Sequence, residues 1–224
     1  MPISAPCRAV EMTASVVGQE INTKFVDLMK GEQKTPEFLA INPQHCVPTV
    51  VDGDVKLWES RSIMRYIVSK KAGLESDLYP VSDLPLRAKI DQLLDYDHGT
   101  LYNRFGKWFY PICFHGAKPD SDESKKNKDA IHETLNLMNE HFIQGKFLTG
   151  DKLTIADISC AASLTMFKVA KIELEKYEKI CSFMKNVENA VPNWDGINKK
   201  PMEDFGAWFE NALKKSEEPE KNES

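Results

Sequence analysis

The spacing of hydrophobic and polar positions changes near residue 80, and before that point short helical and strand-like patterns alternate. Apolar and small residues recur at helical spacing over 4–17, and Gly18 follows as a stop, which predicts a helix. Apolar and polar positions then alternate over 21–28 in the way typical of a β-strand. The chain therefore begins with a predicted helix followed by a predicted strand.

Turn residues divide the next part of the chain. Thr-Pro at 35–36 and Asn-Pro at 42–43 mark the start and the end of a short predicted helix. Two β-prone runs within 47–58 flank an Asp-Gly pair, which predicts a hairpin, and Ser60 can cap the helix that follows. The order helix-strand-helix-strand-strand-helix predicts an α/β domain over 1–77.

After a linker with prolines and polar residues at 78–84, the pattern is helical throughout. Apolar residues keep near-helical spacing over two long stretches, and aromatic residues at 205–209 mark a last short helix. These features predict an all-helical domain over 85–214. The end of the chain, 215–224, is too charged to pack and is predicted to be a disordered tail.

One helix start carries an unusually clear signal. In Leu-Thr-Ile-Ala-Asp, Thr154 is placed as an N-cap and Asp157 can accept a hydrogen bond from the N–H of the cap, while Leu153 can pack against Ile158. Small residues further along allow this helix to pass through the centre of a bundle. The pattern favours a capping role for Asp157 over a role as a catalytic acid.

Charge and hydropathy narrow the choice of partners. The formal net charge is -5 over 224 residues, and no long basic cluster is present. We therefore expect no nucleic acid and no anionic membrane as partner. No apolar run approaches the roughly 18 residues of a membrane span, and the first residues do not have the pattern of a signal peptide, so a cytoplasmic location is expected.

The cysteines and histidines do not suggest a metal site. The five cysteines are an odd number, widely scattered, with no CxxC pair, which argues against a disulfide framework or a zinc site. No pair of histidines has metal-ligand spacing on one helix face. We expect reduced thiols, mostly buried, and no metal.

Several motifs together resemble one family. In chain order they are SAPCRAV, NPQHCVPTV, the Asp-Gly hairpin, WESRSI and LTIAD. Their order and spacing over 4–208 resemble the cytosolic glutathione transferases, closest to the insect delta and epsilon classes. The resemblance implies a thioredoxin-like N-terminal domain, an all-α C-terminal domain and a homodimer. It also implies that glutathione, as a co-substrate and with no other cofactor, binds in the first domain and a hydrophobic electrophile in the second.

The proline at position 48 stands where a strand begins, although it removes one hydrogen-bond donor from the sheet. A trans proline on an edge strand is the ordinary explanation, since about 5–6% of X-Pro bonds are cis. The resemblance instead implies a cis bond before Pro48, with the backbone of Val47 turned outward to pair with the cysteinyl amide of glutathione. It also implies that His45 contacts the glycyl carboxylate, whereas an isolated loop histidine is more often structural.

The γ-glutamyl end of glutathione carries an ammonium and a carboxylate, and WES offers a partner for each. Glu59 suits the ammonium as a counter-ion, and the N–H and hydroxyl of Ser60 at a helix N-terminus suit the carboxylate. By resemblance Arg61 also reaches the ligand. An ordinary helix start, with Ser60 as cap and Glu59 compensating the helix dipole, is compatible with this role.

Conjugation requires the thiolate of glutathione, and a hydroxyl at the positive end of a helix lowers the pKa of a thiol. The matching catalytic residue is Ser4, for which an ordinary N-cap is the alternative. A redox relative would place a cysteine here, so Ser4 followed by Cys7 favours transfer over disulfide exchange. Delta-like chains have a complete strand before this serine. Three residues precede Ser4 here, so the first strand is expected to be truncated.

The site for the electrophile is expected to be hydrophobic. By resemblance it lies at the end of a long helix and is lined by Tyr102, Tyr110 and Phe114, with Trp208 closing it, although an aromatic stripe is more often core than pocket. We therefore predict a glutathione transferase that conjugates glutathione to hydrophobic electrophiles in xenobiotic detoxification. The alternative is a non-catalytic glutathione-transferase-like protein that binds apolar ligands.

Overall fold

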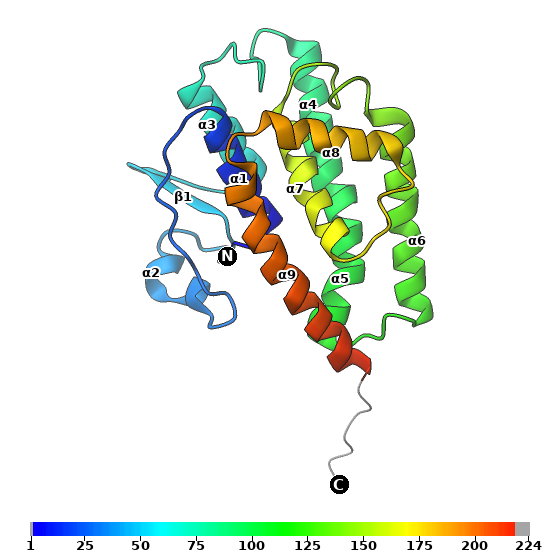
Figure 1. Ribbon diagram of the computed structural model, residues 1–224. Helices are drawn as coiled ribbons and strands as arrows, with labels where there is room; N and C mark the ends of the chain where they lie inside the picture. The colour runs from blue at the N-terminus through cyan, green and yellow to red at the C-terminus, as the bar shows by residue number, and fades with distance from the viewer. Residues whose placement is uncertain (1, 218–224) are drawn as a thin grey trace.

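The computed structural model describes residues 2–217 and contains an α/β part followed by a helical part (Figure 1). The first part begins with helix α1 (Ala5–Val16), which the sequence predicts. After it come the short helix α2 (Pro36–Leu39), strands β1 (Thr49–Asp52) and β2 (Val55–Trp58), and helix α3 (Ser60–Lys71). Helix α1 packs against α3 on one side and against the helical part on the other.

The predicted hairpin is confirmed. Strands β1 and β2 pair antiparallel, with Thr49 opposite Trp58 and Asp52 opposite Val55, so that Gly53 and Asp54 form a two-residue turn. Gly53 has a φ of 59°, a conformation that glycine adopts without steric cost, which explains the glycine at the first position of the turn. Within the described residues these two strands form the whole sheet.

The prediction of a strand over 21–28 is wrong. This segment has no regular secondary structure, and no strand of the described chain pairs with it. Apolar and polar residues alternate in this segment as they do in a strand, but a strand also needs a hydrogen-bonded neighbour. The residues that precede α1 form a turn and provide no such neighbour. As a result, Ile21 and Phe25 are 42% and 62% exposed. The expected truncation of the first strand agrees with this two-stranded sheet.

The second part is helical, as predicted. Two of its helices continue into π-helical segments, at Asp97–Tyr102 after α4 and at Met138–Phe142 after α6. Its helices are α4 (Leu84–Tyr96), α5 (Asn103–His115), α6 (Asp122–Leu137), α7 (Ile155–Val169), α8 (Glu178–Ala190) and α9 (Trp194–Glu217). Helix α9 extends beyond 214, where the sequence suggested a tail, and 218–224 lie outside the described residues.

Helix α7 is the centre of the core. Every residue from Ile155 to Phe167 is buried, and small residues along it allow α1 and α4 to pack closely. The buried side chain of Arg8 on α1 donates hydrogen bonds to Thr165 Oγ1 (2.9 Å) and to Asn198 Oδ1. This arginine therefore fixes the start of α1 against both α7 and α9.

The capping role predicted for Asp157 is confirmed. Its carboxylate accepts hydrogen bonds from the N–H of Thr154 at 2.7 Å and from the N–H of Leu148 at 2.8 Å. Burial raises the pKa of the Asp157 carboxyl to about 6, while these hydrogen bonds act in the opposite direction. Asp157 thus joins the start of α7 to the loop before it.

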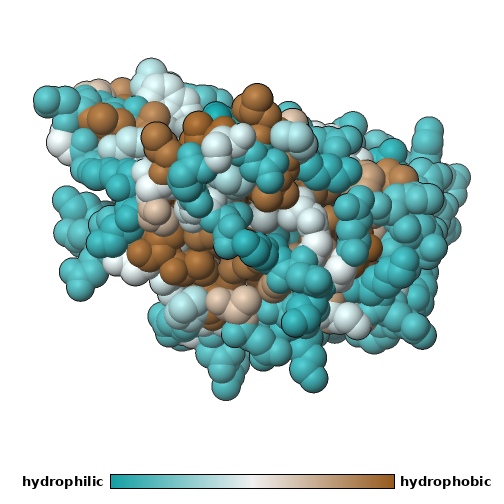
Figure 2. Space-filling view, turned by 90° about the horizontal axis from the view of Figure 1, so that it is seen from above, coloured by the Kyte–Doolittle hydropathy of each residue, from teal (hydrophilic) through white to brown (hydrophobic). Residues whose placement is uncertain are grey.

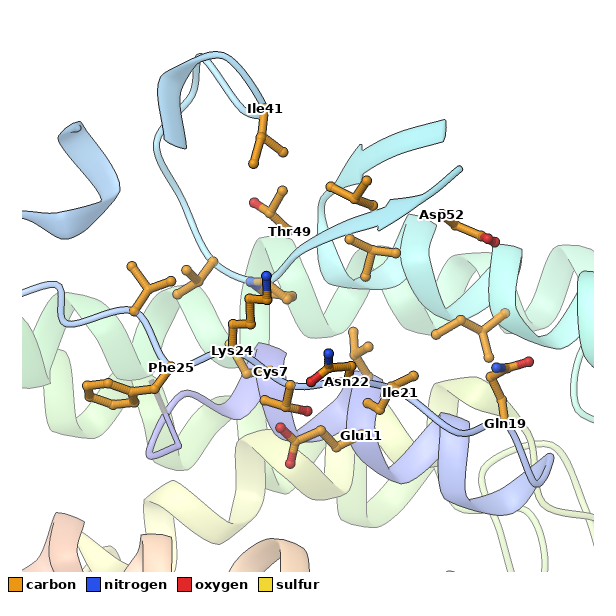
Figure 3. A pocket seen from close by; sticks show the side chains of 18 of the residues that line it. Cys7, Glu11, Gln19, Ile21, Asn22, Lys24, Phe25, Ile41, Thr49 and Asp52 are labelled. Carbon is orange, nitrogen blue, oxygen red and sulfur yellow. The ribbon is translucent and has the colours of Figure 1, made fainter. Parts of the chain in front are cut away.

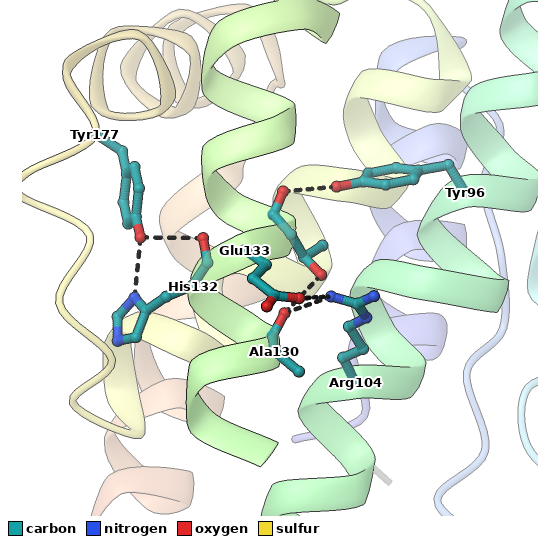
Figure 4. Close-up of polar contacts among 7 residues, drawn as sticks. Tyr96, Arg104, Ala130, His132, Glu133 and Tyr177 are labelled. Atoms are coloured by element: carbon teal, nitrogen blue, oxygen red, sulfur yellow. Dashed lines mark hydrogen bonds and ion pairs between the residues drawn. The ribbon is translucent and has the colours of Figure 1, made fainter. Parts of the chain in front are cut away.

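Polar contacts attach the outer helix α6 to its neighbours (Figure 4). The hydroxyl of Tyr96 on α4 donates to the carbonyl of Thr134 at 2.9 Å, and Arg104 on α5 donates to the carbonyl of Ala130 at 2.7 Å. On the other side of α6, the hydroxyl of Tyr177 lies 2.9 Å from His132 Nδ1. These bonds satisfy polar groups at the edges of an otherwise apolar contact.

The surface has both hydrophobic and hydrophilic regions. Figure 2 shows hydrophobic side chains gathered at the left and centre of one face, with mainly hydrophilic side chains on the right. Within residues 2–217, no helix combines the length and the hydrophobicity that crossing a membrane requires.

Candidate functional site

Ser4 lies at the N-terminus of α1, as predicted. It is the N-cap, and its Oγ accepts a hydrogen bond from the N–H of Cys7 at 3.4 Å. Because the oxygen is the acceptor, the hydroxyl proton stays available for donation to a further group. Burial raises the pKa of the Cys7 thiol, and the neighbouring Ser4 hydroxyl partly offsets this effect, so that Cys7 remains a thiol at neutral pH.

The loop before β1 presents a free stretch of backbone. The peptide bond between Val47 and Pro48 is cis, as predicted. Among residues 2–217, no hydrogen bond involves the N–H or the C=O of Val47. Because strand pairing begins at Thr49, these two groups remain available to a ligand with a peptide-like backbone.

Asn42 holds this loop in shape and was missed as a site residue by the sequence reasoning. It is fully buried, its amide donates to Cys46 C=O (3.1 Å) and to Thr49 Oγ1 (2.9 Å), and its Oδ1 accepts from the Gln44 N–H (2.9 Å). In the sequence, the Asn-Pro pair indicated only a turn and not this role of Asn42.

His45, the predicted site residue in this loop, is exposed and has a φ of 47°.

Glu59 has an unusual backbone conformation. Its φ is 68° and its ψ is 104°, which is sterically costly for a residue with a Cβ. Such strain, of about 1–3 kcal/mol, is characteristic of functional sites. Glu59 directly follows β2, and the pairing of Thr49 with Trp58 places it at the same end of the hairpin as Pro48. The hairpin therefore brings together two predicted site segments that lie apart in the sequence.

Helix α3 begins with free donors. Ser60 is buried, and the N-cap Glu59 makes no side-chain hydrogen bond to the first turn. In the described part of the chain, the N–H groups of Ser60, Arg61 and Ser62 have no hydrogen-bond partner. An uncapped helix N-terminus with free N–H groups attracts an anion such as a carboxylate.

Arg61 pairs with a buried carboxylate from the second part of the chain. Its guanidinium contacts Asp97, which is fully buried, and lies 3.4 Å from His98 Nδ1. Asp97 also accepts hydrogen bonds from the hydroxyls of Ser159 and Ser163, the latter at 2.7 Å. The sequence reasoning missed Asp97, because no local pattern links it to Arg61.

The four predicted aromatic residues form one continuous row. The hydroxyls of Tyr102 and Tyr110 lie 3.0 Å apart, the rings of Tyr110 and Phe114 are 6.1 Å apart, and those of Phe114 and Trp208 are 5.3 Å apart. Tyr110 and Phe114 are 40% and 47% exposed, so this row is surface as well as core. Burial raises the pKa of Tyr102 well above its ordinary value, so its hydroxyl remains protonated.

A cavity of about 710 Å³ lies beside this site and does not coincide with it (Figure 3). Its lining includes Cys7, Val47 and Pro48 but neither Glu59 nor Ser60. The cavity therefore shows that the first turn of α1 and the Val47 loop are neighbours. In the described residues, no cluster of histidine, cysteine and acidic residues is arranged to hold a metal ion.

Comparisons with known proteins agree with this arrangement. Two family models match, the glutathione S-transferase N-terminal domain over residues 4–69 and the glutathione S-transferase C-terminal domain over residues 101–190. A solved delta-class glutathione transferase of Nilaparvata lugens is 37% identical, with a TM-score of 0.88 over 95% of this chain and 97% of its own. The chain belongs to the glutathione S-transferase family.

Other members of the family are similar over nearly their whole length. An epsilon-class glutathione S-transferase from the housefly Musca domestica is 29% identical, covers 95% of both chains and has a TM-score of 0.85. A glutathione transferase homologue of Drosophila mojavensis, solved with bound glutathione, is 31% identical over 95% of this chain and 94% of its own, with a TM-score of 0.83.

Family membership confirms the fold and the class of enzyme. The first part is the predicted thioredoxin-like domain, here with a small sheet, and the second is the helical domain of glutathione S-transferases. The chain is thus a transferase with glutathione as its co-substrate. The roles of the individual site residues remain predictions.

Proposed function

We propose that this glutathione S-transferase conjugates reduced glutathione to hydrophobic electrophiles and so detoxifies xenobiotics. One observation carries the proposal. The hairpin register, with Thr49 opposite Trp58, sets the free backbone of Val47 beside Glu59 and the uncapped start of α3, while Val47 and the first turn of α1 border one cavity. The Val47 backbone, Glu59 and the first N–H groups of α3 therefore lie at one end of the hairpin, and the first turn of α1, which follows Ser4, borders the same cavity as Val47.

In this proposal each polar part of glutathione has its own partner. The N–H and C=O of Val47 pair with the cysteinyl backbone, the carboxylate of Glu59 binds the ammonium, and the N–H and hydroxyl of Ser60 bind the γ-glutamyl carboxylate. The exposed His45 contacts the glycyl carboxylate. The Drosophila mojavensis structure with bound glutathione supports binding of this ligand by a similar chain.

Arg61 has a less direct part in the proposed site. Its guanidinium is already paired with Asp97, and its Nε is buried without a hydrogen-bond partner among the described residues. We assign to Arg61 the positioning of Ser60, the residue before it, and the addition of positive charge next to the γ-glutamyl carboxylate.

The proposed chemistry requires a stabilised thiolate. A free thiol with a pKa of about 8.5 is mostly protonated at neutral pH. The hydroxyl of Ser4 donates to the thiolate, and the N-terminal end of α1 adds the positive end of the helix dipole. The thiolate then attacks the electrophile, forming a carbon–sulfur bond as the leaving group departs with its electron pair.

The aromatic row is the proposed binding surface for the electrophile. Tyr110 and Phe114 are 40% and 47% exposed and connect the more buried rings of Tyr102 and Trp208, and apolar molecules bind to such surfaces. The Tyr102 hydroxyl, which remains protonated, can donate a hydrogen bond to a polar group of the electrophile. A homodimer in the cytoplasm is part of the same proposal.

An activated aryl chloride with glutathione tests this function. We expect turnover that follows saturation kinetics in both substrates, together with glutathione binding measured by calorimetry. Binding without turnover would instead support the alternative, a glutathione-transferase-like protein that binds ligands without catalysis. Tyr110→Ala should raise KM for the aryl chloride while the affinity for glutathione stays the same. Leu137→Ala, at an apolar side chain 42% exposed on α6, is the control.

A further inference from the structure

One position in the aromatic row has no side chain. Tyr102 directly precedes α5, Tyr110 and Phe114 lie within it, and Gly106 occupies the place between the two tyrosines at the same interval of four residues. Residues four apart lie one above the other on the same face of a helix. Glycine in a helix interior is less stable than alanine, so an isolated glycine there indicates a reason in packing or function.

The ring of Tyr110 occupies the space that a side chain at position 106 would need. A Cβ added to Gly106 would lie 3.0 Å from Cε2 and 3.2 Å from Cδ2 of Tyr110, closer than an ordinary carbon contact of about 3.5–4.0 Å. Side chains on a helix lean towards its N-terminus, so the Tyr110 ring lies back over Gly106 and buries it. The missing side chain therefore allows the ring to lie flat along α5.

This orientation brings two hydroxyl groups together. Residues eight positions apart in a helix are separated by about 12 Å along its axis, yet the hydroxyls of Tyr102 and Tyr110 lie 3.0 Å apart. One hydroxyl donates to the other, so one hydrogen of the pair stays available for a further acceptor. Among residues 2–217, neither hydroxyl has another hydrogen-bond partner. The pair is therefore a preformed donor, strengthened by its internal hydrogen bond, at one end of an apolar row.

The hydroxyl pair lies at the boundary between the two domains. Burial has the largest effect in raising the pKa of Tyr102, and the neighbouring Tyr110, Asp97 and Arg61 also act on it. Arg61 directly follows Ser60 of the proposed glutathione site. The polar end of the aromatic row thus has a residue of the first domain as an electrostatic neighbour.

We propose that Gly106 is a specificity-determining residue of the electrophile site. It keeps the Tyr110 ring flat against α5, and the hydroxyl pair then selects aromatic electrophiles that carry a nitro or carbonyl oxygen as a hydrogen-bond acceptor. This role rests on the proposed function of the aromatic row. An electrophile without an acceptor leaves the free hydroxyl hydrogen unpaired once it covers the row, which costs affinity. Gly106 acts through Tyr110 and is therefore a positioning residue.

Two benzyl chlorides test the preference. 4-Nitrobenzyl chloride and benzyl chloride react with glutathione at the same carbon and release the same chloride, so they differ in the nitro group alone. The ratio of their kcat/KM values is divided by the ratio of their uncatalysed rates with glutathione. In wild type this corrected ratio should exceed one. In Gly106→Leu, where the new side chain takes the place of the Tyr110 ring, it should fall by about three- to tenfold.

An unchanged corrected ratio in Gly106→Leu, or a ratio of one in wild type, would overturn the proposal. Gly106→Ala displaces the ring by less and should give a smaller fall in the same direction. It therefore provides a second measurement with little added bulk.

Tyr110→Phe separates the hydroxyl pair from the shape of the site, because it removes the hydroxyl and keeps the ring. It should lower the corrected ratio as Gly106→Leu does. The variant with both substitutions should show no further fall, since each alone already breaks the pair. Losses that add up in the double variant would show that position 106 acts without the pair and would reject its assigned role.

Gly206 on α9 offers a matched control. A Cβ added there would lie 3.2 Å from Cγ1 of Val169, so Gly206→Ala introduces a similarly close contact against α7 instead of against Tyr110. The corrected ratio should stay at the wild-type value. An equal fall in Gly206→Ala and Gly106→Ala would contradict a role specific to position 106.

Unreactive ligands distinguish failure of this proposal from failure of the proposed function. 4-Nitrobenzyl alcohol and benzyl alcohol replace the two chlorides, and their binding is measured by ligand-observed NMR with no glutathione in solution. Wild type should bind the nitro compound more tightly, and Gly106→Leu should reduce this difference by about three- to tenfold. This contrast without any conjugation would reject the proposed function and support the role of Gly106. The same difference in both proteins would reject the role of Gly106.

Discussion

The substitution Ser4→Ala removes a single oxygen with two roles. In the structure this oxygen accepts a hydrogen bond from the Cys7 N–H as the N-cap of α1. In the proposed mechanism its proton is donated to the thiolate of glutathione. The first role concerns stability and the second concerns rate, so the two effects can be measured separately.

The expected magnitudes follow from these roles. A hydrogen bond to a charged acceptor contributes about 1.5–3 kcal/mol, which corresponds to an increase of about one to two units in the pKa of the bound thiol. At neutral pH, kcat/KM should fall by about 10- to 150-fold. Loss of the cap should lower the free energy of unfolding by about 1 kcal/mol. Glutathione affinity should hardly change, because other groups hold the peptide.

The assay is the pH dependence of kcat/KM, with the ultraviolet absorbance of bound thiolate as an independent titration. The difference in kcat/KM between Ser4→Ala and wild type should become smaller above the raised pKa of the bound thiol, since the thiolate then forms without the hydroxyl. Ser121→Ala removes the N-cap of α6 in the same way, so it should lose similar stability with no change in rate. Equal rates and equal thiol pKa values in Ser4→Ala and wild type would refute the role of Ser4.

Three further predictions concern binding, pH and assembly. Glu59→Gly and Glu59→Ala should each weaken glutathione binding by about 1–3 kcal/mol in calorimetry, as should Ser60→Ala. Chemical unfolding should nevertheless find the Gly variant about 1 kcal/mol more stable than the Ala variant, because glycine tolerates the φ of 68°, and equal stabilities would disprove backbone strain. Between its ordinary pKa and the folded value of about 6, Asp157 keeps its proton in the folded chain and loses it in the unfolded chain. Wild type should therefore lose up to about 3 kcal/mol relative to Asp157→Asn as pH rises from about 4 to 6, and a constant difference would contradict this shift. Light scattering at micromolar concentration should give the mass of a homodimer with the helix segment 62–66 near its two-fold axis and well over 1,000 Å² buried, whereas a monomer mass would argue against it.

Local patterns were sufficient for most elements of the fold. The N-cap at Ser4, the hairpin turn and the contact of Asp157 with Thr154 depend on residues within a few positions of one another, so the sequence alone predicts them. The segment 21–28 shows the limit. Its alternation suits a strand, but a strand also needs a hydrogen-bonded neighbour from another part of the chain, and the local pattern of 21–28 carries no information on that neighbour.

In the candidate site, too, short motifs predict some features, and others depend on contacts between distant parts of the chain. The motifs around Pro48 and Glu59 predicted its residues, and the structure adds the hairpin register that places them at one end. The pairing of Arg61 with Asp97 joins residues 36 positions apart and could not be read from either motif. The aromatic residues and Trp208 were named by resemblance to the family, and the contact of Phe114 with Trp208 depends on how α9 packs against α5.

The pairing of Arg61 with Asp97 restricts how the two domains can be shuffled. Arg61 belongs to the first domain, and Asp97, Ser159 and Ser163 to the second. A chimera that takes each domain from a different parent must carry both halves of this ion pair. An arginine or an aspartate left alone there is a buried charge without compensation, which costs about 3–5 kcal/mol. Parents for recombination with this chain should therefore be chosen for a matching pair at positions 61 and 97 before overall similarity is considered.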